Sequence, residues 1–193
     1  KLKFLEYPTG HLMDKAPIRF SYHRPSQDPS TFKWIFEKVS VSPMIETGVY
    51  NLSMAENHNF HLYIDTDSEG TETVEVTDNL SKTNIPRWKI IRNPDLSYYI
   101  TVYGSELYLH ASTNSSDPKV SIGKFEHKNG WTYKWQITPT EQENVYMISL
   151  YDETYQGYLH LIDNDVLNGS PLGTGPYVPM QDSCYKFYIR LAE

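Results

Sequence analysis

Histidine is the residue type in this sequence with the widest range of chemistry, as a metal ligand, a base or a hydrogen-bonding group. The chain has seven histidines. His58 and His61 are three residues apart, but next to a strand this spacing directs the two side chains to opposite faces. No third ligand follows nearby in the sequence. We therefore predict no metal site.

Motifs for nucleophilic or phosphate chemistry are also missing from the sequence. The chain has no Gly-x-Ser-x-Gly elbow, no phosphate-binding loop and no His-Glu-x-x-His pair. Cys184 is the single cysteine and directly precedes a predicted strand, which indicates a buried, unreactive thiol. Most carboxylates fall in polar turns. We predict a protein that is not an enzyme and that needs no cofactor.

The residues that favour binding gather near the C-terminus. Sugar recognition needs an aromatic face against the sugar ring and carboxylate or amide groups for its hydroxyls. The polar stretch 163–177 offers both, and its glycines and prolines allow a tight backbone turn. The candidate ligand-binding residues are His160, Asp163, Asn164, Asp165, Asn168 and Tyr177.

An internal repeat positions these residues. A large aromatic residue two positions ahead of Ile, or directly ahead of it, recurs at Trp34, Trp88, Trp135 and Phe187, at intervals of 54, 47 and 52 residues. Further short strands with Tyr, Val, Ile and Leu follow at similar offsets, separated by Asn, Asp, Gly, Ser and Pro. The pattern predicts three units of four strands, at about 48–92, 97–138 and 144–191. Trp88, Trp135 and Phe187 are expected at equivalent buried positions.

Composition agrees with an all-β fold. The 193 residues are 39% hydrophobic and include 16 tyrosines, and Tyr, Val, Ile and Thr suit half-buried strands. The formal net charge is −7, which argues against nucleic acid and anionic membranes as partners. No apolar run approaches the ~18–20 residues of a membrane-spanning helix. We predict no nucleic-acid partner and no integral membrane insertion.

The N-terminal part of the chain is less regular. Residues 1–47 are predicted to be an N-terminal extension or a degenerate extra unit. The stretch 30–39 fits a helix, since Phe32, Ile35, Phe36 and Val39 lie at helical spacing. It fits a strand equally well when Trp34 is aligned with the other aromatic positions. Residues 48–193 are predicted to form the main domain.

Four sequons suggest an extracellular location. The candidate N-glycosylation sites are Asn51, Asn79, Asn114 and Asn168, each followed by a serine two residues later. The sequence begins at Lys1. These features favour a processed, secreted glycoprotein.

The repeat resembles the β-trefoil superfamily over about three quarters of the chain. In that fold, twelve strands form a six-stranded barrel closed by three hairpins. The stretch 159–173 is similar to a unit of the ricin-B-type lectins, which implies carbohydrate binding. Asn168 and Gly169 match the Asn-Gly turn of those lectins, and Phe187 stands where they have Trp. His160 occupies the place of their sugar-binding Asp, and Tyr185 replaces their Gln.

A second resemblance is to the trefoil domain of insect low-molecular-mass hemolymph lipoproteins. It rests on Trp88-Lys-Ile90, Val145-Tyr-Met-Ile148 and Ile122-Gly-Lys-Phe125, and it implies a secreted storage or carrier protein. Trefoil protease inhibitors and toxin-associated modules are a third alternative. Lectin-like binding of glycans or glycoproteins is the preferred hypothesis.

Overall fold

A computed structural model of the chain describes residues 44–66, 72–79, 85–113, 120–127, 129–152, 155 and 157–192. The predictions for residues 1–43, including the helix or strand at 30–39, lie outside these residues, and so does Asn114. The division of the chain at residues 47 and 48 stays a prediction. Within the described ranges the all-β prediction is confirmed, because strands dominate and the helical structure is a single 3-10 segment.

The strands are short and separated by turns. Their bounds are β1 (Gly48–Met54), β2 (His61–Thr66), β3 (Glu72–Thr77), β4 (Trp88–Arg92), β5 (Tyr98–Val102), β6 (Leu107–Ser112), β7 (Val120–Lys124), β8 (Trp131–Thr132), β9 (Trp135–Pro139), β10 (Val145–Leu150), β11 (Tyr158–Leu161), β12 (Ser170–Gly175) and β13 (Lys186–Leu191). The 3-10 segment η2 (Pro179–Tyr185) connects β12 to β13.

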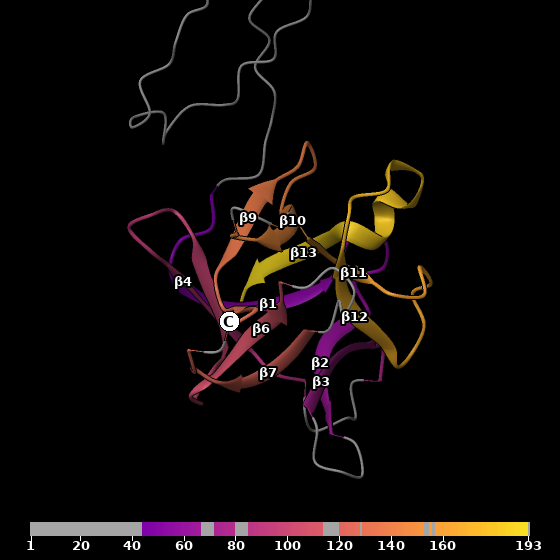
Figure 1. The fold of residues 1–193 in the computed structure, drawn as a ribbon. Helices are drawn as coiled ribbons and strands as arrows, with labels where there is room; N and C mark the ends of the chain where they lie inside the picture. The colour runs from indigo at the N-terminus through magenta and orange to yellow at the C-terminus, as the bar shows by residue number, and fades with distance from the viewer. Residues whose placement is uncertain are drawn as a thin grey trace, which may run out of the picture.

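A closed ring of antiparallel strands forms the body of the molecule (Figure 1). β1 pairs with β4, β4 with β5, β5 with β9, β9 with β10, β10 with β13, and β13 returns to β1. Closure satisfies the backbone hydrogen bonds that an open sheet would leave at its edges.

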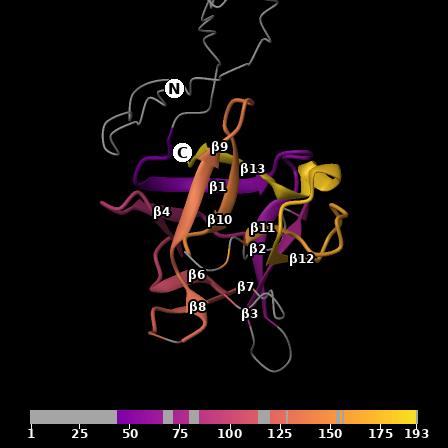
Figure 2. The same cartoon turned by 45° about the horizontal axis from the view of Figure 1, so that its top comes forward.

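Hairpins extend from this ring. β2 pairs with β3, β6 with β7, and β11 with β12, and β3 also contacts β7 and β12. Figure 2 shows β6, β7 and β8 on one side of the molecule and β11, β12 and η2 on another. No helix among the described residues is long and apolar enough to cross a membrane.

The strand register repeats around the ring. The predicted aromatic positions each lie opposite a tyrosine of another ring strand: Tyr50 opposite Trp88, Tyr98 opposite Trp135, and Tyr146 opposite Phe187. The side chains of Trp88, Trp135 and Phe187 are 0% exposed, so their predicted burial is confirmed. Large rings at matching heights fill the interior of the ring of strands.

The repeated positions differ in their polar contacts. Trp135 Nε1 donates to the carbonyl oxygen of Leu109 at 3.0 Å, whereas the buried Trp88 Nε1 has no acceptor among the described residues. The turns before β5 and β10 also differ. Leu96 and Asn144 both have positive φ, at 68° and 59°, but this conformation suits Asn and strains Leu.

Candidate functional site

The predicted binding residue His160 lies on β11 and is half-buried. Its Nδ1 is 3.1 Å from the carbonyl oxygen of Tyr158. Its ring stacks on Tyr185, with centroids 4.9 Å apart and planes 16° apart. Gly175 on β12 makes room for the imidazole, because a Cβ there would lie 2.8 Å from His160 Cε1. The imidazole is therefore packed within the hairpin.

Three predicted residues lie together in the turn after β11. Asp163, Asn164 and Asp165 are exposed, and Asn164 adopts a φ of 58°. The carbonyl oxygen of Asn164 accepts a bond from the Cys184 thiol at 3.1 Å. That thiol is buried, as predicted, and burial raises the pKa of Cys184.

Asn168 links this turn to the end of β3. Its Oδ1 accepts from the hydroxyl of Thr77 at 3.0 Å and from the backbone N–H of Asp78 at 2.9 Å. Its Nδ2 donates to Asp78 Oδ1 at 2.6 Å. The side chain thus joins two parts of the fold that lie far apart in the sequence.

Tyr177 belongs to an aromatic group at the other end of β12. It contacts Tyr158 and Tyr185, with ring centroids 5.8 and 5.3 Å away. Its hydroxyl donates to Asp182 Oδ1 at 2.5 Å, and this bond raises the pKa of Tyr177. Asp182 also pairs with Lys186.

The predicted residues therefore form two groups. His160 and Tyr177 both contact Tyr185, whereas 163–165 and Asn168 lie at the hairpin tip. The strand β12 between Asn168 and Tyr177 spans six residues, or roughly 20 Å at ~3.3 Å per residue. One small ligand would therefore not contact both Asn168 and Tyr177.

The histidine packing recurs in the preceding hairpin. His110 on β6 has its Nδ1 3.2 Å from the carbonyl oxygen of Tyr108 and lies against Tyr133 at 4.9 Å. A Cβ on Gly123 would lie 3.0 Å from His110 Cε1. His110 and His160 therefore occupy equivalent places in successive hairpins, and both rings have a packing role.

Beside this second hairpin lies a hollow of about 310 Å³ that we call the aromatic hollow. Its lining residues come from β5, from β8 and from the segments on either side of β8. They are Tyr99, Phe125, Glu126, His127, Asn129, Trp131, Thr132, Tyr133 and Lys134. Sequence reasoning missed this site, although the Gly123-Lys-Phe125 stretch and Trp131 marked its position.

The rings of the aromatic hollow support one another. Phe125 is 42% exposed and lies 4.8 Å from Tyr133 and 6.0 Å from Tyr99, the latter edge to face. The Tyr133 hydroxyl donates to the carbonyl oxygen of Lys124 at 3.1 Å and accepts from the backbone N–H of Glu126 at 3.2 Å. These bonds fix the loop that presents Phe125.

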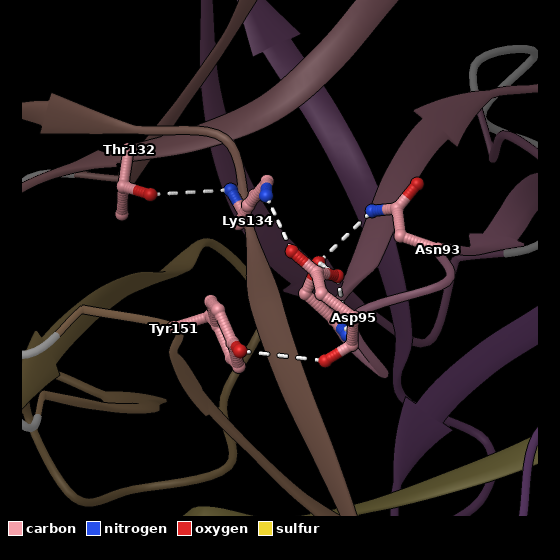
Figure 3. Close-up of polar contacts among 6 residues, drawn as sticks. Asn93, Asp95, Thr132, Lys134 and Tyr151 are labelled. Atoms are coloured by element: carbon pink, nitrogen blue, oxygen red, sulfur yellow. Dashed lines mark hydrogen bonds and ion pairs between the residues drawn. The ribbon is translucent and has the colours of Figure 1, made fainter.

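A polar cluster borders the hollow, and Lys134 belongs to both (Figure 3). Lys134 Nζ donates to Asp95 Oδ2 at 2.6 Å. Asp95 Oδ1 accepts from the hydroxyl of Ser97 at 2.5 Å and from its backbone N–H at 3.1 Å. The Tyr151 hydroxyl donates to the Asp95 carbonyl oxygen at 3.3 Å. The bond to Lys134, followed by those to Ser97, lowers the pKa of Asp95 to about 2.

The candidate glycosylation sites differ in their surroundings. Asn51, Asn79 and Asn168 are all exposed, but Asn51 lies within β1, opposite Arg190 of β13. Exposure is compatible with modification at all three. Glycosylation itself stays a prediction.

No protein-family model matches the sequence, and no curated protein matches it. Solved structures do match. A Macrolepiota procera ricin B-like lectin in complex with lactose aligns with 78% of this chain and all of its own, at 15% identity and a TM-score of 0.58. A Polyporus squamosus lectin bound to the epitope Neu5Acα2-6Galβ1-4GlcNAc aligns with 76% of this chain and 50% of its own, at 15% identity and a TM-score of 0.58.

The fold is a β-trefoil. A mosquitocidal holotoxin also aligns with 77% of this chain, at 22% identity and a TM-score of 0.61. The chain spans only 18% of the length of that toxin. Identities at this level establish a shared fold, and function has to be argued from the site. The β-trefoil resembles ricin-B lectin domains, as the sequence indicated.

Proposed function

We propose that this β-trefoil protein is a secreted, non-catalytic, lectin-like protein that binds glycans or glycoproteins. We infer further that its strands group into three four-stranded units, with β8 as an addition to the second. The repeated pairing of Tyr50, Tyr98 and Tyr146 with the aromatic positions supports this grouping.

The observation that carries the proposal is the aromatic hollow. It combines partly exposed aromatic rings, which suit the apolar face of a sugar, with carboxylate and amide groups for the hydroxyls. Phe125 and Trp131 supply rings, while Glu126 and Asn129 supply polar groups. A volume near 310 Å³ is at the small end of ligand sites, which are roughly 300–1,000 Å³. It suits one or two sugar residues.

The histidines support placing the site at this hollow. His160 replaces the lectin-type Asp, and its ring packs on Tyr185 beside Gly175. His110 packs in the same way beside Gly123. An imidazole in a packed hairpin offers fewer bonds to sugar hydroxyls than a free carboxylate does. We therefore propose that sugar binding uses the neighbouring aromatic hollow.

A glycan array with the intact protein tests the function. We expect binding of a restricted set of glycans, with the bound glycan recovered unchanged after long incubation. Phe125→Ala should weaken binding, whereas Tyr103→Ala should not, because Tyr103 is 50% exposed and lies outside the hollow. Binding lost only in Tyr177→Ala would move the site to the third hairpin. Cleavage of the glycan would contradict a non-catalytic role.

Secretion has a separate test. The intact mass of protein from its native source should fall after glycosidase treatment if Asn51, Asn79, Asn114 or Asn168 is modified. An unchanged mass would remove the main support for an extracellular location.

A toxin-associated module is the second candidate. The match to the mosquitocidal holotoxin favours it, because the aligned region makes up only 18% of the length of that toxin. In that case the glycan site would serve to attach a larger protein to a cell surface. The carrier and protease-inhibitor alternatives are distinguished by bound lipid in native mass spectrometry and by titration against proteases.

A further inference from the structure

The aromatic hollow is lined by one carboxyl side chain, Glu126, and one lysine, Lys134. Their environments differ. Glu126 is exposed in the loop after β7, whereas the ammonium of Lys134 has a partner. This difference determines which charge a ligand in the hollow would meet.

The Lys134 ammonium is held by Asp95. The Nζ–Oδ2 distance is 2.6 Å, and both side chains are only 39% exposed. Nζ also lies 5.8 Å from the centre of the Tyr151 ring. Figure 3 shows the Lys134 side chain directed toward Asp95 from the segment between β8 and β9. Its charge is therefore compensated within the protein.

Asp95 is itself held in place. Ser97 donates two hydrogen bonds to Oδ1, and Asn93 Nδ2 donates to the Ser97 hydroxyl at 3.0 Å. This leaves Oδ2 for Lys134. A four-carbon stem gives a free lysine many positions, but here the turn that carries Asp95 selects one of them.

These contacts have a consequence for ligand charge. An acidic sugar in the hollow would approach the Glu126 carboxylate and find the Lys134 ammonium already paired with Asp95. Like charges a few ångströms apart repel, and the repulsion strengthens where water is partly excluded. A neutral sugar avoids this penalty and still has the rings and the Glu126 oxygens as partners.

We propose that the aromatic hollow selects uncharged glycans over acidic ones, and that Asp95, outside the hollow, sets this selectivity by holding Lys134. Asp95 is a positioning residue, since it acts through the lysine. This inference rests on the proposed glycan binding.

The test uses pairs of glycans that differ by one acidic group, such as Galβ1-4GlcNAc with and without a terminal sialic acid, across a printed panel. The parent should bind the neutral member of each recognised pair at least tenfold more tightly. Asp95→Asn should reduce this ratio by about tenfold, because one uncompensated ammonium becomes available to the acidic member. Asp165→Asn makes the same change of charge at the distant hairpin turn and should leave the ratio unchanged.

A double variant separates charge from structure. Lys134→Met combined with Asp95→Asn should restore the preference for neutral glycans, since the freed cation is gone; a structural role of Asp95 would leave the double variant impaired. Equal binding of both members by the parent overturns the proposal, and so does an unchanged ratio in Asp95→Asn or an equal change in Asp165→Asn. Absence of all glycan binding by the parent would overturn the proposed function itself.

Discussion

Replacing Trp88 and Trp135 by Phe, one at a time, compares two buried indoles that differ in one hydrogen bond. Both side chains are 0% exposed, and both lie opposite a tyrosine of a neighbouring strand. Each substitution removes the same ring atoms and leaves a similar cavity, at a cost of ~1–2 kcal/mol. The shared cavity cost cancels in the comparison.

The hydrogen bond does not cancel. Trp135→Phe loses the 3.0 Å bond to the Leu109 carbonyl, which adds about 1 kcal/mol. Trp88→Phe removes a buried N–H that has no acceptor among the described residues. Loss of this unsatisfied donor stabilises the folded state by ~1 kcal/mol or more. The unfolding free energy should therefore fall about 2 kcal/mol further for Trp135→Phe than for Trp88→Phe.

Urea unfolding followed by circular dichroism measures this difference, provided that the slope with denaturant is the same for both variants. The melting temperatures should differ by roughly 4–8 °C for a chain of this size. Equal losses, or a larger loss for Trp88→Phe, would refute the assignment of the polar contacts inside the ring of strands.

Three further predictions concern single residues. Leu96→Asn should raise the unfolding free energy by ~0.5–1 kcal/mol in thermal unfolding, because Leu96 has a φ of 68° and is 44% exposed. Asn144→Leu, at a φ of 59°, should lower the unfolding free energy. Changes of the same sign in the two variants would contradict the role of the backbone conformation. The parent should be more stable than Asp95→Asn, fully so above pH 4, and this advantage should disappear as the pH falls to about 2. The reason is that the pKa of Asp95 is lowered from 3.8 to about 2 in the folded state. An advantage that persists at lower pH would exclude the ion pair as its cause. Asn168→Ala should cost ~1–2 kcal/mol in urea unfolding through its bonds to Thr77 and Asp78, whereas Asp163→Ala should cost almost nothing; equal losses would contradict the contacts described.

The repeat was the part of the fold that the sequence predicted best. Aromatic positions such as Trp88 and Trp135 recur because equivalent strands place large rings at the same height in the barrel. The recurrence appears in the sequence as a regular spacing of these aromatic residues. His110 and His160 recur in the same way, each two residues after a tyrosine. Features that repeat can be aligned against each other within one chain.

The candidate site was not predictable in this way. Tyr99 on β5 joins Phe125 and Trp131 because β5, β7 and β8 all pair with β6. That arrangement has no sequence signal. Asn168, predicted as a ligand-binding residue from its Asn-Gly-Ser stretch, has a second contact without a sequence signal. Its amide links the hairpin to Asp78, some 90 positions earlier. Long-range polar contacts decide which polar residues are available to a ligand.

Calorimetric titration of the intact protein with the neutral glycan that binds best on an array tests the central claim most directly. The parent should bind with a dissociation constant in the millimolar to micromolar range, which corresponds to a binding free energy of ~4–8 kcal/mol in magnitude. Phe125→Ala should weaken binding by at least tenfold at unchanged melting temperature, and Tyr103→Ala should bind as the parent does. Undiminished binding by Phe125→Ala, or a parent that binds no glycan, would contradict a lectin-like site in the aromatic hollow.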